Sequence, residues 1–335
     1  MKAIVTADWH FSRSRKKLET CVNVVSWITS YCKNNNIGHI IVAGDVFHHK
    51  SILYSEAAKE LVSILEANPD ITFILLDGNH DLSESSEPVS TISLLKHVPN
   101  VLYVGETQLI SNILFIPFSK NLEQEVKTNS NPWLISHFGL NEAVLSSGIS
   151  IVSNISMKDL CSRYGMVLLG HYHKPQELSM GQTQVYYVGN PYQFDWGERN
   201  EEKRMLLVDF DSGRIDSIPT EGYPKHYVLE IHSEGDIDKV KKESRDLTSQ
   251  GNFVVIWSEV KTNQIDASDL PDVVIIDKSN SEVTNRGIAR EMSLDEKLSR
   301  YLDIRGIPPE SKDLYIDVAK TIINECESIK EIEEG

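Results

Sequence analysis

The stretch Thr72-Phe73-Ile74-Leu75-Leu76-Asp77-Gly78-Asn79-His80-Asp81 is the part of the chain from which the fold can be worked out. Its apolar first half is typical of a buried strand. Its polar second half predicts a turn at the carboxyl end of that strand, where open α/β sheets bind ligands. An amide, an imidazole and a carboxylate in succession are costly there unless something binds them, and the candidate is a metal ion. Gly-Asn also suits an ordinary turn, and His80 could be a surface histidine, so the string needs support from elsewhere.

Four other predicted strands end in groups that can bind metal. With Asn79, the strand ends supply three carboxylate or amide oxygens and four imidazoles, from Asp8, His10, Asp45, Asn79, His137, His171 and His173. Residues two apart in an extended backbone project from the same face, so Asp8 is expected to converge with His10, and His171 with His173. Glycines at 44, 78 and 170 give the backbone room there. Taken singly, an Asp or His after a strand is usually a cap, a turn former or a structural group. That explanation is poor for the whole set, because five unrelated turns would each have to carry groups that can bind metal.

Composition indicates a soluble globular protein of two or three units, with 335 residues, 40% hydrophobic and 24% charged. The net charge of −16 argues at first against a nucleic-acid partner. The charge is unevenly distributed, however. Residues 1–50 hold seven Lys and Arg against three Asp and Glu, whereas residues 201–335 hold eighteen against thirty. The acidity therefore belongs mainly to the later part of the chain, and bound divalent cations would offset more of it near the site.

Neither a membrane span nor a signal peptide is predicted, and the expected location is the cytoplasm. No apolar run reaches the length of about 18 residues that a membrane helix needs, and the chain enters a strand pattern from its first residues. The four cysteines show no CxxC spacing and are expected to be reduced core residues: Cys21, Cys32, Cys161 and Cys326.

The expected fold class is α/β, with two packed mixed β-sheets flanked by helices in a sandwich of the α+β-like kind. Early strands at 2–8, 39–45 and 72–77 alternate with helices at 17–35, 54–67 and 89–97, which predicts βαβ units with right-handed crossovers. Closely spaced strands are then predicted at 101–105, 109–118, 133–137, 166–170, 184–189, 204–210 and 214–218. Spacing this short indicates hairpins.

The character of the chain changes near Tyr223-Pro224. A strand at 226–232, a helix at 236–249 and a strand at 253–260 predict a small α/β domain, with residues 273–276 as an added edge strand. Two amphipathic helices are expected further on, one opened by the capping box Ser293-Leu294-Asp295-Glu296 and one starting near Ser311. The predicted organisation is a domain at 1–222, a small domain at 223–278, a polar linker at 279–292 and a helical segment at 293–335.

The ordered pattern Asp-x-His, Gly-Asp, Gly-Asn-His-Asp, His, Gly-His-x-His resembles the calcineurin-like metallophosphoesterase family, over roughly residues 1–220. The resemblance implies that one divalent cation is held by Asp8, His10, Asp45 and His173, and a second by Asp45, Asn79, His137 and His171. Mixed oxygen and imidazole ligands suit Mn²⁺, Fe²⁺ or Zn²⁺, and Mn²⁺ is the expected ion. Two such cations can polarise a phosphoryl group and generate hydroxide for in-line attack. His80, next to Asn79, is the candidate for stabilising the pentavalent state or protonating the leaving oxygen.

The run Asp45-Val46-Phe47-His48-His49-Lys50 narrows the substrate. Protein phosphatases of the family resemble one another in having an Asp three residues after the shared Asp, followed by Arg-Gly. The Phe-His pair instead resembles the SbcD-type exonucleases of double-strand-break repair, including the bacteriophage recombination nucleases. The turn Gly189-Asn190-Pro191 is similar to that type's segment after its last histidine. The match implies that His48 positions a DNA end, the alternative being an exposed loop histidine.

Further expectations concern partners. Four basic residues lie within seven residues of His10: Arg13, Arg15, Lys16 and Lys17. They are predicted to hold DNA phosphates, and the alternative is that they form a solvated loop before a helix. The resemblance implies a DNA-binding capping domain at 223–278, an SbcC-like coiled-coil ATPase bound by residues 293–329, and a homodimer. The helices near 54–67 and 89–97 are the expected dimer surface. Because no GxxxxGK[ST] motif occurs, nucleotide hydrolysis is assigned to the partner.

The function expected from these features is that of a metal-dependent DNA exonuclease acting within a complex, with endonuclease cleavage as a further activity, located in the host cytoplasm if phage-encoded. One rival is another enzyme of the family, a phosphodiesterase or phosphatase acting on a small molecule or a phosphoprotein. The second rival is a non-catalytic DNA-end tether, against which the complete ligand set speaks.

Overall fold

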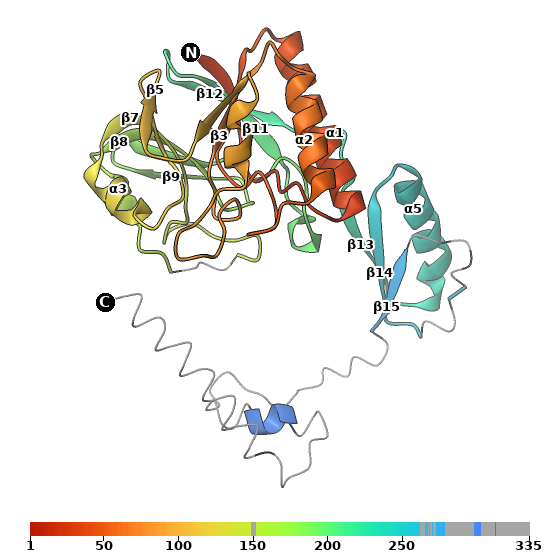
Figure 1. The fold of residues 1–335 in the computed structure, drawn as a ribbon. Coiled ribbons are helices and arrows are strands. Elements are labelled where there is room, and N and C mark those ends of the chain that lie inside the picture. The colour runs from red at the N-terminus through yellow and green to blue at the C-terminus, as the bar shows by residue number, and fades with distance from the viewer. Residues whose placement is uncertain are drawn as a thin grey trace. The chain divides into compact units, whose positions relative to one another are not determined.

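The computed structural model describes residues 1–148, 152–261, 265–266, 268, 270, 273–278, 298–302 and 312. The chain divides into two compact units (Figure 1). The larger unit comprises Met1–Tyr227 with Asp246–Val254, and the smaller one comprises Val228–Arg245 with Val255–Gly335. Within the part of the chain that is described, none of the helices is both long enough and apolar enough to span a membrane.

The larger unit is built on two six-stranded mixed sheets, which confirms the predicted fold class. In the first sheet the order is β12 (Arg214–Pro219), β11 (Arg204–Asp209), β1 (Lys2–Thr6), β2 (His39–Val42), β3 (Thr72–Leu76) and β4 (Val101–Val104). In the second it is β5 (Gln108–Ile110), β6 (Ile113–Ile116), β7 (Asn131–His137), β8 (Tyr164–Gly170), β10 (Thr183–Tyr187) and β9 (Gln176–Met180). Strands β1 to β4 are mutually parallel, as are β6, β7, β8 and β10, so their carboxyl ends meet at common edges.

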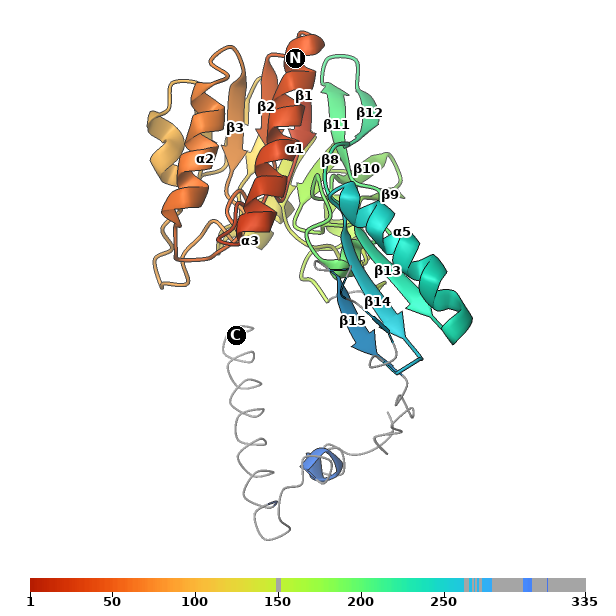
Figure 2. The same cartoon turned by 90° about the vertical axis from the view of Figure 1, so that its right-hand side faces the viewer.

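Both faces of the first sheet are buried at β1, β2 and β3, which explains why these strands are apolar runs. Alternate residues of β1 point to opposite sides. Ile4 packs with the helices α1 (Arg15–Asn34) and α2 (Ser55–Glu66), which lie beside this sheet in Figure 2. Val5 packs instead in the core between the sheets, together with Phe115 and Leu168. A third core lies on the outer side of the second sheet, against the short helices α3 (Leu122–Thr128) and α4 (Met157–Leu160).

The predicted single strand at 109–118 is wrong. Residues Ser111 and Asn112 both have positive φ, 47° and 69°, and they form a two-residue turn that folds the segment into the antiparallel pair β5 and β6. Two-residue hairpin turns require positive φ because their twist then matches that of the strands. The expectation of hairpins is also wrong for β6, β7, β8 and β10, which are parallel. The predicted helix at 89–97 is a 3₁₀ helix, η1 (Ile92–His97).

A separate three-stranded sheet contains β13 (His226–Ile231), β14 (Phe253–Ser258) and β15 (Val274–Asp277), in that order. The 3₁₀ helix η3 (Glu234–Asp236) and helix α5 (Ile237–Ser249) connect β13 to β14. The predicted edge strand is confirmed as β15, parallel to β14. The predicted linker 279–292 lies outside the described residues, as does most of the predicted helical segment 293–335. Within that segment, residues 298–302 are described and are helical. The domain limits therefore stay predictions.

Candidate metal centre

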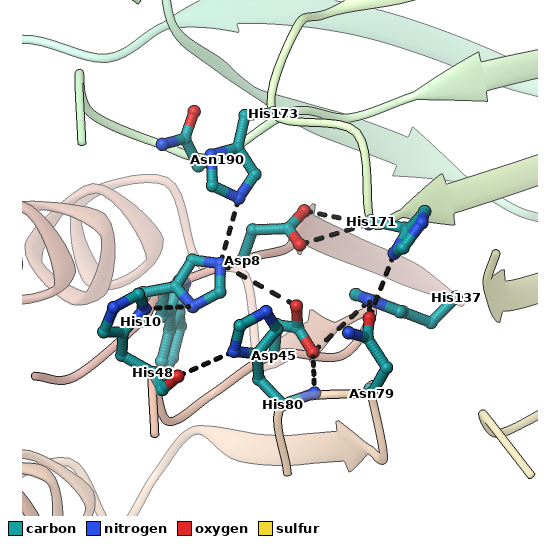
Figure 3. Close-up of polar contacts among 12 residues, drawn as sticks. Asp8, His10, Asp45, His48, Asn79, His80, His137, His171, His173 and Asn190 are labelled. Carbon is teal, nitrogen blue, oxygen red and sulfur yellow. Dashed lines mark hydrogen bonds and ion pairs between the residues drawn. The ribbon is translucent and has the colours of Figure 1, made fainter. Parts of the chain in front are cut away.

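The seven predicted ligands gather where strands from both sheets end. Figure 3 shows their side chains pointing toward one another, with Asp8 and Asp45 in the middle of the group. Two sets of three have ligand atoms within 4.8 Å of one another: Asp8, His10 and His173, and Asp8, Asp45 and His137. Asn79 and His171 lie beside the second set, because the Asn79 Oδ1 atom is 3.0 Å from both His137 Nε2 and His171 Nδ1.

The convergence of Asp8 with His10 does not come from an extended backbone, so that part of the prediction is wrong. Asp8, His10 and Asp45 have φ values of 53°, 52° and 55°, in the left-handed region. Such a conformation costs a non-glycine residue on the order of 1–3 kcal/mol and persists where surrounding contacts impose it. Here the two loops are bonded to each other, since Asp8 N donates to Gly44 O and His10 N donates to Asp45 O, both at 3.0 Å.

Glycine is required at two positions of this edge because the backbones approach closely. A Cβ atom on Gly78 would lie 2.2 Å from Asp45 Oδ1, and one on Gly170 would lie 2.1 Å from Ala43 O. Either side chain would push the Asp45 loop out of place, which explains the glycines noted in the sequence.

His137 has one ring nitrogen directed at two oxygen acceptors, an arrangement that suits a positive charge between them. Its Nδ1 is 2.8 Å from Ala43 O and must donate to that carbonyl, which leaves Nε2 as the nitrogen that can bind a proton or a metal ion. That Nε2 atom lies 3.0 Å from Asn79 Oδ1 and 3.3 Å from Asp45 Oδ1, which are acceptors. Burial lowers the pKa of His137, but the Asp45 carboxylate outweighs burial and raises that pKa to about 9. The surroundings therefore favour a positive charge at this point, and a divalent cation fits it.

The other side of the site has the same character. His173 Nδ1 lies 2.6 Å from Glu198 Oε1 and donates to it. This bond orients the ring so that His173 Nε2 lies 2.9 Å from His10 Nε2. Asp45 reaches both sides, because its Oδ2 atom is 3.7 Å from His10 Nε2 while its Oδ1 atom approaches His137. Burial raises the pKa of Asp45, yet the neighbouring His137 holds it well below its usual range. Mixed carboxylate, amide and imidazole donors suit Mn²⁺, Fe²⁺ or Zn²⁺, so the residues present fit two cations that share Asp45.

Glu198 is a functional residue that the sequence interpretation missed. Besides His173 it binds Lys203 Nζ at 2.9 Å, Asn190 Nδ2 at 3.0 Å and the Phe194 backbone N–H at 2.9 Å. Burial raises the pKa of Glu198, but the bond from His173 and the charge of Lys203 lower it well below its ordinary value. A buried, ionised Glu198 therefore fixes the tautomer and orientation of His173. Glu198 follows the Gly189-Asn190-Pro191 turn, and nothing local in the sequence indicates the histidine that it contacts.

Asp81 was also missed as a structural support of the site. Its carboxylate accepts from the backbone N–H groups of Val46 at 3.2 Å, Phe47 at 3.0 Å and Gly78 at 3.0 Å. It thereby ties the loop that carries Asp45 to the loop that carries Asn79.

Replacing Glu198 by glutamine is expected to weaken Mn²⁺ binding by about 10–100-fold, the usual effect of losing an outer partner of a ligating histidine. Glutamine keeps the size of the side chain but removes the charge that orients His173 and raises its basicity. Electron paramagnetic resonance of free Mn²⁺ during titration measures the change. Glu177→Gln is the matched control, since Glu177 is an exposed glutamate that also pairs with a cation, Arg204. Equal Mn²⁺ affinities for the two variants would contradict this role of Glu198.

His48 and His80 lie on the His10 side of the centre, as Figure 3 shows. The His80 Nδ1 atom is 2.6 Å from His48 O and donates to it, while His48 Nδ1 is 3.4 Å from His10 Nδ1. Burial, followed by the neighbouring positive groups, lowers the pKa of His48 to about 4, so its imidazole is neutral. Phe194, which the sequence interpretation missed, covers this side with its ring centroid 4.8 Å from that of His48.

The basic stretch is only partly a loop, because Arg15, Lys16 and Lys17 form the first turn of α1. Lys17 approaches the centre, with its Nζ atom 3.6 Å from the centroid of the Phe194 ring. Arg15 does not, since it is 92% exposed and pairs with Glu19 on the same helix. Arg13 lies over the ring of Tyr54. The amino end of a helix carries the positive end of the helix dipole, and these cations add positive charge to it. The first turn of α1 therefore attracts anions.

Comparison with known families and proteins gives a consistent result. The sequence model described as "Calcineurin-like phosphoesterase" matches residues 1–175. The SbcD component of the SbcCD nuclease of Bacillus subtilis strain 168 is 23% identical over 263 residues, which cover 64% of this chain and 67% of that protein. The corresponding SbcD protein of Escherichia coli K12 is 20% identical over 406 residues, covering 98% of this chain and 100% of that protein.

Solved structures with detectable similarity include an archaeal phosphodiesterase and the Pseudomonas putida nuclease MPE. The first has a TM-score of 0.38 and 14% identity, covering 65% of this chain and 99% of that one. The second has a TM-score of 0.33 and 12% identity, covering 64% of this chain and 87% of that one.

Proposed function

This chain belongs to the calcineurin-like phosphoesterase family of metal-dependent hydrolases, and we propose that it is a DNA nuclease of the SbcD type. The observation that carries the proposal is the group formed by His48, Phe194 and Lys17 beside His10. A histidine that is not one of the proposed ligands, an aromatic ring and an ammonium group next to the ions suit a nucleotide phosphate with its sugar and base. The relatives named as components of the SbcCD nuclease support the same substrate class.

In this proposal two Mn²⁺ ions bind at the seven strand-end residues, one at Asp8, His10, Asp45 and His173, the other at Asp45, Asn79, His137 and His171. When bound, they supply Lewis acidity at the phosphoryl group and lower the pKa of the attacking water. The protein's own residues do the rest. Glu198 and the Ala43 carbonyl orient His173 and His137 for binding.

His80 and His48 act on the substrate. His80 is held through its Nδ1 bond to His48 O, so its Nε2 atom is free to carry a second proton and deliver it to the leaving oxygen. His48 positions the DNA end. Lys17 holds a phosphate, while Arg13, Arg15 and Lys16 extend the positive surface along the DNA. Exonuclease cleavage from an end is the main activity, with endonuclease cleavage as a second.

The His80→Asn variant is expected to lose about 10²–10⁴-fold in DNA cleavage, the range for removal of a general acid. Asparagine can still bond to His48 O but cannot carry a transferable proton. Mn²⁺ affinity should stay at the wild-type value, because His80 is outside the proposed ligand set. His39→Asn, at the amino end of β2 and so at the opposite end of that strand from the site, serves as the control. An unchanged cleavage rate in His80→Asn would remove His80 from the mechanism.

The partners proposed are DNA, a second copy of the chain and an SbcC-like coiled-coil ATPase bound by residues 293–329. A homodimer through the segments 54–67 and 89–97 is supported by exposed apolar side chains, with Val89 67% and Leu94 64% exposed. The small domain at 223–278 would cap the DNA. A cytoplasmic location, in the host if the gene is viral, agrees with these roles.

A substrate panel tests the proposal against its rivals. The full chain is incubated in Mn²⁺ with end-labelled duplex DNA, cyclic nucleotides and phosphopeptides, with and without an SbcC-like ATPase. The nuclease proposal expects release of the labelled end. Hydrolysis confined to cyclic nucleotides or phosphopeptides would favour the first rival, and DNA binding without hydrolysis of any substrate would favour the tether.

A further inference from the structure

We infer that His10, His48 and His80 form a third cation site, made only of imidazoles, which binds Zn²⁺ in competition with one of the two proposed catalytic ions. One ring nitrogen from each histidine lies within 4.8 Å of the other two. The three rings lie together on one side of Asp45 in Figure 3. Two of them, His48 and His80, are outside the ligand set of the proposed ion pair.

The three rings bring candidate ligand nitrogens close to one another. His80 Nδ1 donates to His48 O, 2.6 Å away, so the His80 Nε2 atom keeps its lone pair. The His48 Nδ1 and His10 Nδ1 atoms face each other at 3.4 Å. Two nitrogens bound tetrahedrally to Zn²⁺, each at about 2.0–2.1 Å, lie about 3.3–3.4 Å apart. An ion between these two rings therefore requires little movement of either.

The donor set selects the kind of ion. Three imidazoles without a carboxylate suit Zn²⁺ and similar borderline ions, whereas Mn²⁺ prefers sites with carboxylate oxygens such as those of Asp8 and Asp45. Three protein ligands leave one coordination position open, as in catalytic zinc sites. A phosphate oxygen or a water molecule can fill that position.

His10 couples the third site to the proposed ion pair through its tautomer. A neutral imidazole offers one free ring nitrogen. The His10 Nε2 atom faces His173 Nε2 at 2.9 Å, whereas its Nδ1 atom faces His48. If Nδ1 binds Zn²⁺, the proton stays on Nε2 and points at His173, where it excludes the ion that Asp8, His10 and His173 would hold.

The consequence for activity rests on the proposed nuclease function. A zinc ion in this position engages His48 and His80, which act on the substrate, and removes one catalytic ion, so Zn²⁺ inhibits Mn²⁺-dependent DNA cleavage. Zinc binding itself does not depend on what the enzyme cleaves, so the two parts can be tested separately.

The binding test measures Zn²⁺ affinity by competition with a chelator, using the full chain in excess Mn²⁺. Loss of an outer partner alone costs about 10–100-fold in affinity, so losing a ligand in His48→Asn should weaken Zn²⁺ binding at least tenfold. His49→Asn is the matched control, because His49 neighbours His48 and packs on Tyr54 without belonging to the group of three. Its Zn²⁺ affinity should equal that of the wild type.

Anomalous scattering at the zinc edge gives a second readout that needs no variant. Crystals of the wild-type chain grown in Mn²⁺ and soaked in Zn²⁺ should show a zinc peak among His10, His48 and His80. Equal affinities in the three proteins, or a zinc peak only among Asp8, Asp45 and His137, would overturn the third site. Zinc binding that depends on His48 in a chain that cuts no DNA would support the site and reject the nuclease function.

Discussion

The Asp45→Asn variant is expected to lose about three orders of magnitude in phosphodiester hydrolysis, because loss of Lewis-acid stabilisation costs several kcal/mol and each 1.36 kcal/mol is tenfold in rate. Asp45 has oxygens that approach ring nitrogens on both sides of the centre, with Oδ2 3.7 Å from His10 Nε2 and Oδ1 3.3 Å from His137 Nε2. Asparagine keeps the shape but removes the charge that both proposed ions share. Hydrolysis of a chromogenic phosphodiester in Mn²⁺ measures the effect without assuming a DNA substrate.

The control for this prediction is Asp70→Asn, which changes an exposed aspartate before β3. It should retain wild-type activity. Circular dichroism establishes that Asp45→Asn is folded, since the variant also removes the partner of His137. A folded Asp45→Asn protein with more than a tenth of the wild-type rate would contradict the shared-ligand assignment.

The Lys203→Met variant is expected to lower the free energy of unfolding by about 3–5 kcal/mol, the effect of removing one member of a buried ion pair. The Lys203 side chain is 0% exposed, and its ammonium group contacts Glu198 at 2.9 Å and Glu201 at 2.6 Å. Methionine fills the same space but removes the ammonium group from the buried Glu198 and the largely buried Glu201. Urea unfolding followed by tryptophan fluorescence measures the change.

Lys50→Met is the matched control for this prediction. Lys50 faces Glu84 at 3.9 Å on the surface, with side chains 39% and 74% exposed. Exposed pairs of this kind contribute about 0–1 kcal/mol. A Lys203→Met effect no larger than that of Lys50→Met would mean that Lys203 does not neutralise the Glu198 cluster.

The grouping of the seven proposed ligands could be predicted from the sequence because its signal is local. An apolar run followed directly by Asp, Asn or His marks the carboxyl end of a buried strand, and the parallel arrangement of β1, β2 and β3 brings such ends together. The same reasoning gave the two packed sheets. It failed at the β5–β6 hairpin because Ser111-Asn112 is a weaker turn signal than Asn-Gly, and the flanking isoleucines concealed it.

The supports of the centre could not be predicted because their signal is not local. Glu198 reaches His173 across 25 residues, and Phe194 packs against His48 from a different loop. The left-handed backbone at Asp8 and His10 is imposed by hydrogen bonds to the neighbouring loop. The residue types at these positions therefore do not predict it. The sequence thus predicts which residues can serve as ligands, while tertiary contacts determine which nitrogen of each histidine is offered.

The most direct measurement is the Mn²⁺ stoichiometry of the full chain together with its electron paramagnetic resonance spectrum. If the five strand ends hold two cations that share Asp45, the loaded protein binds two Mn²⁺ per chain. Its spectrum then shows magnetic coupling between them, which disappears in Asp45→Asn. Binding of a single Mn²⁺ per chain, or of two Mn²⁺ ions without coupling, would contradict the two-ion centre.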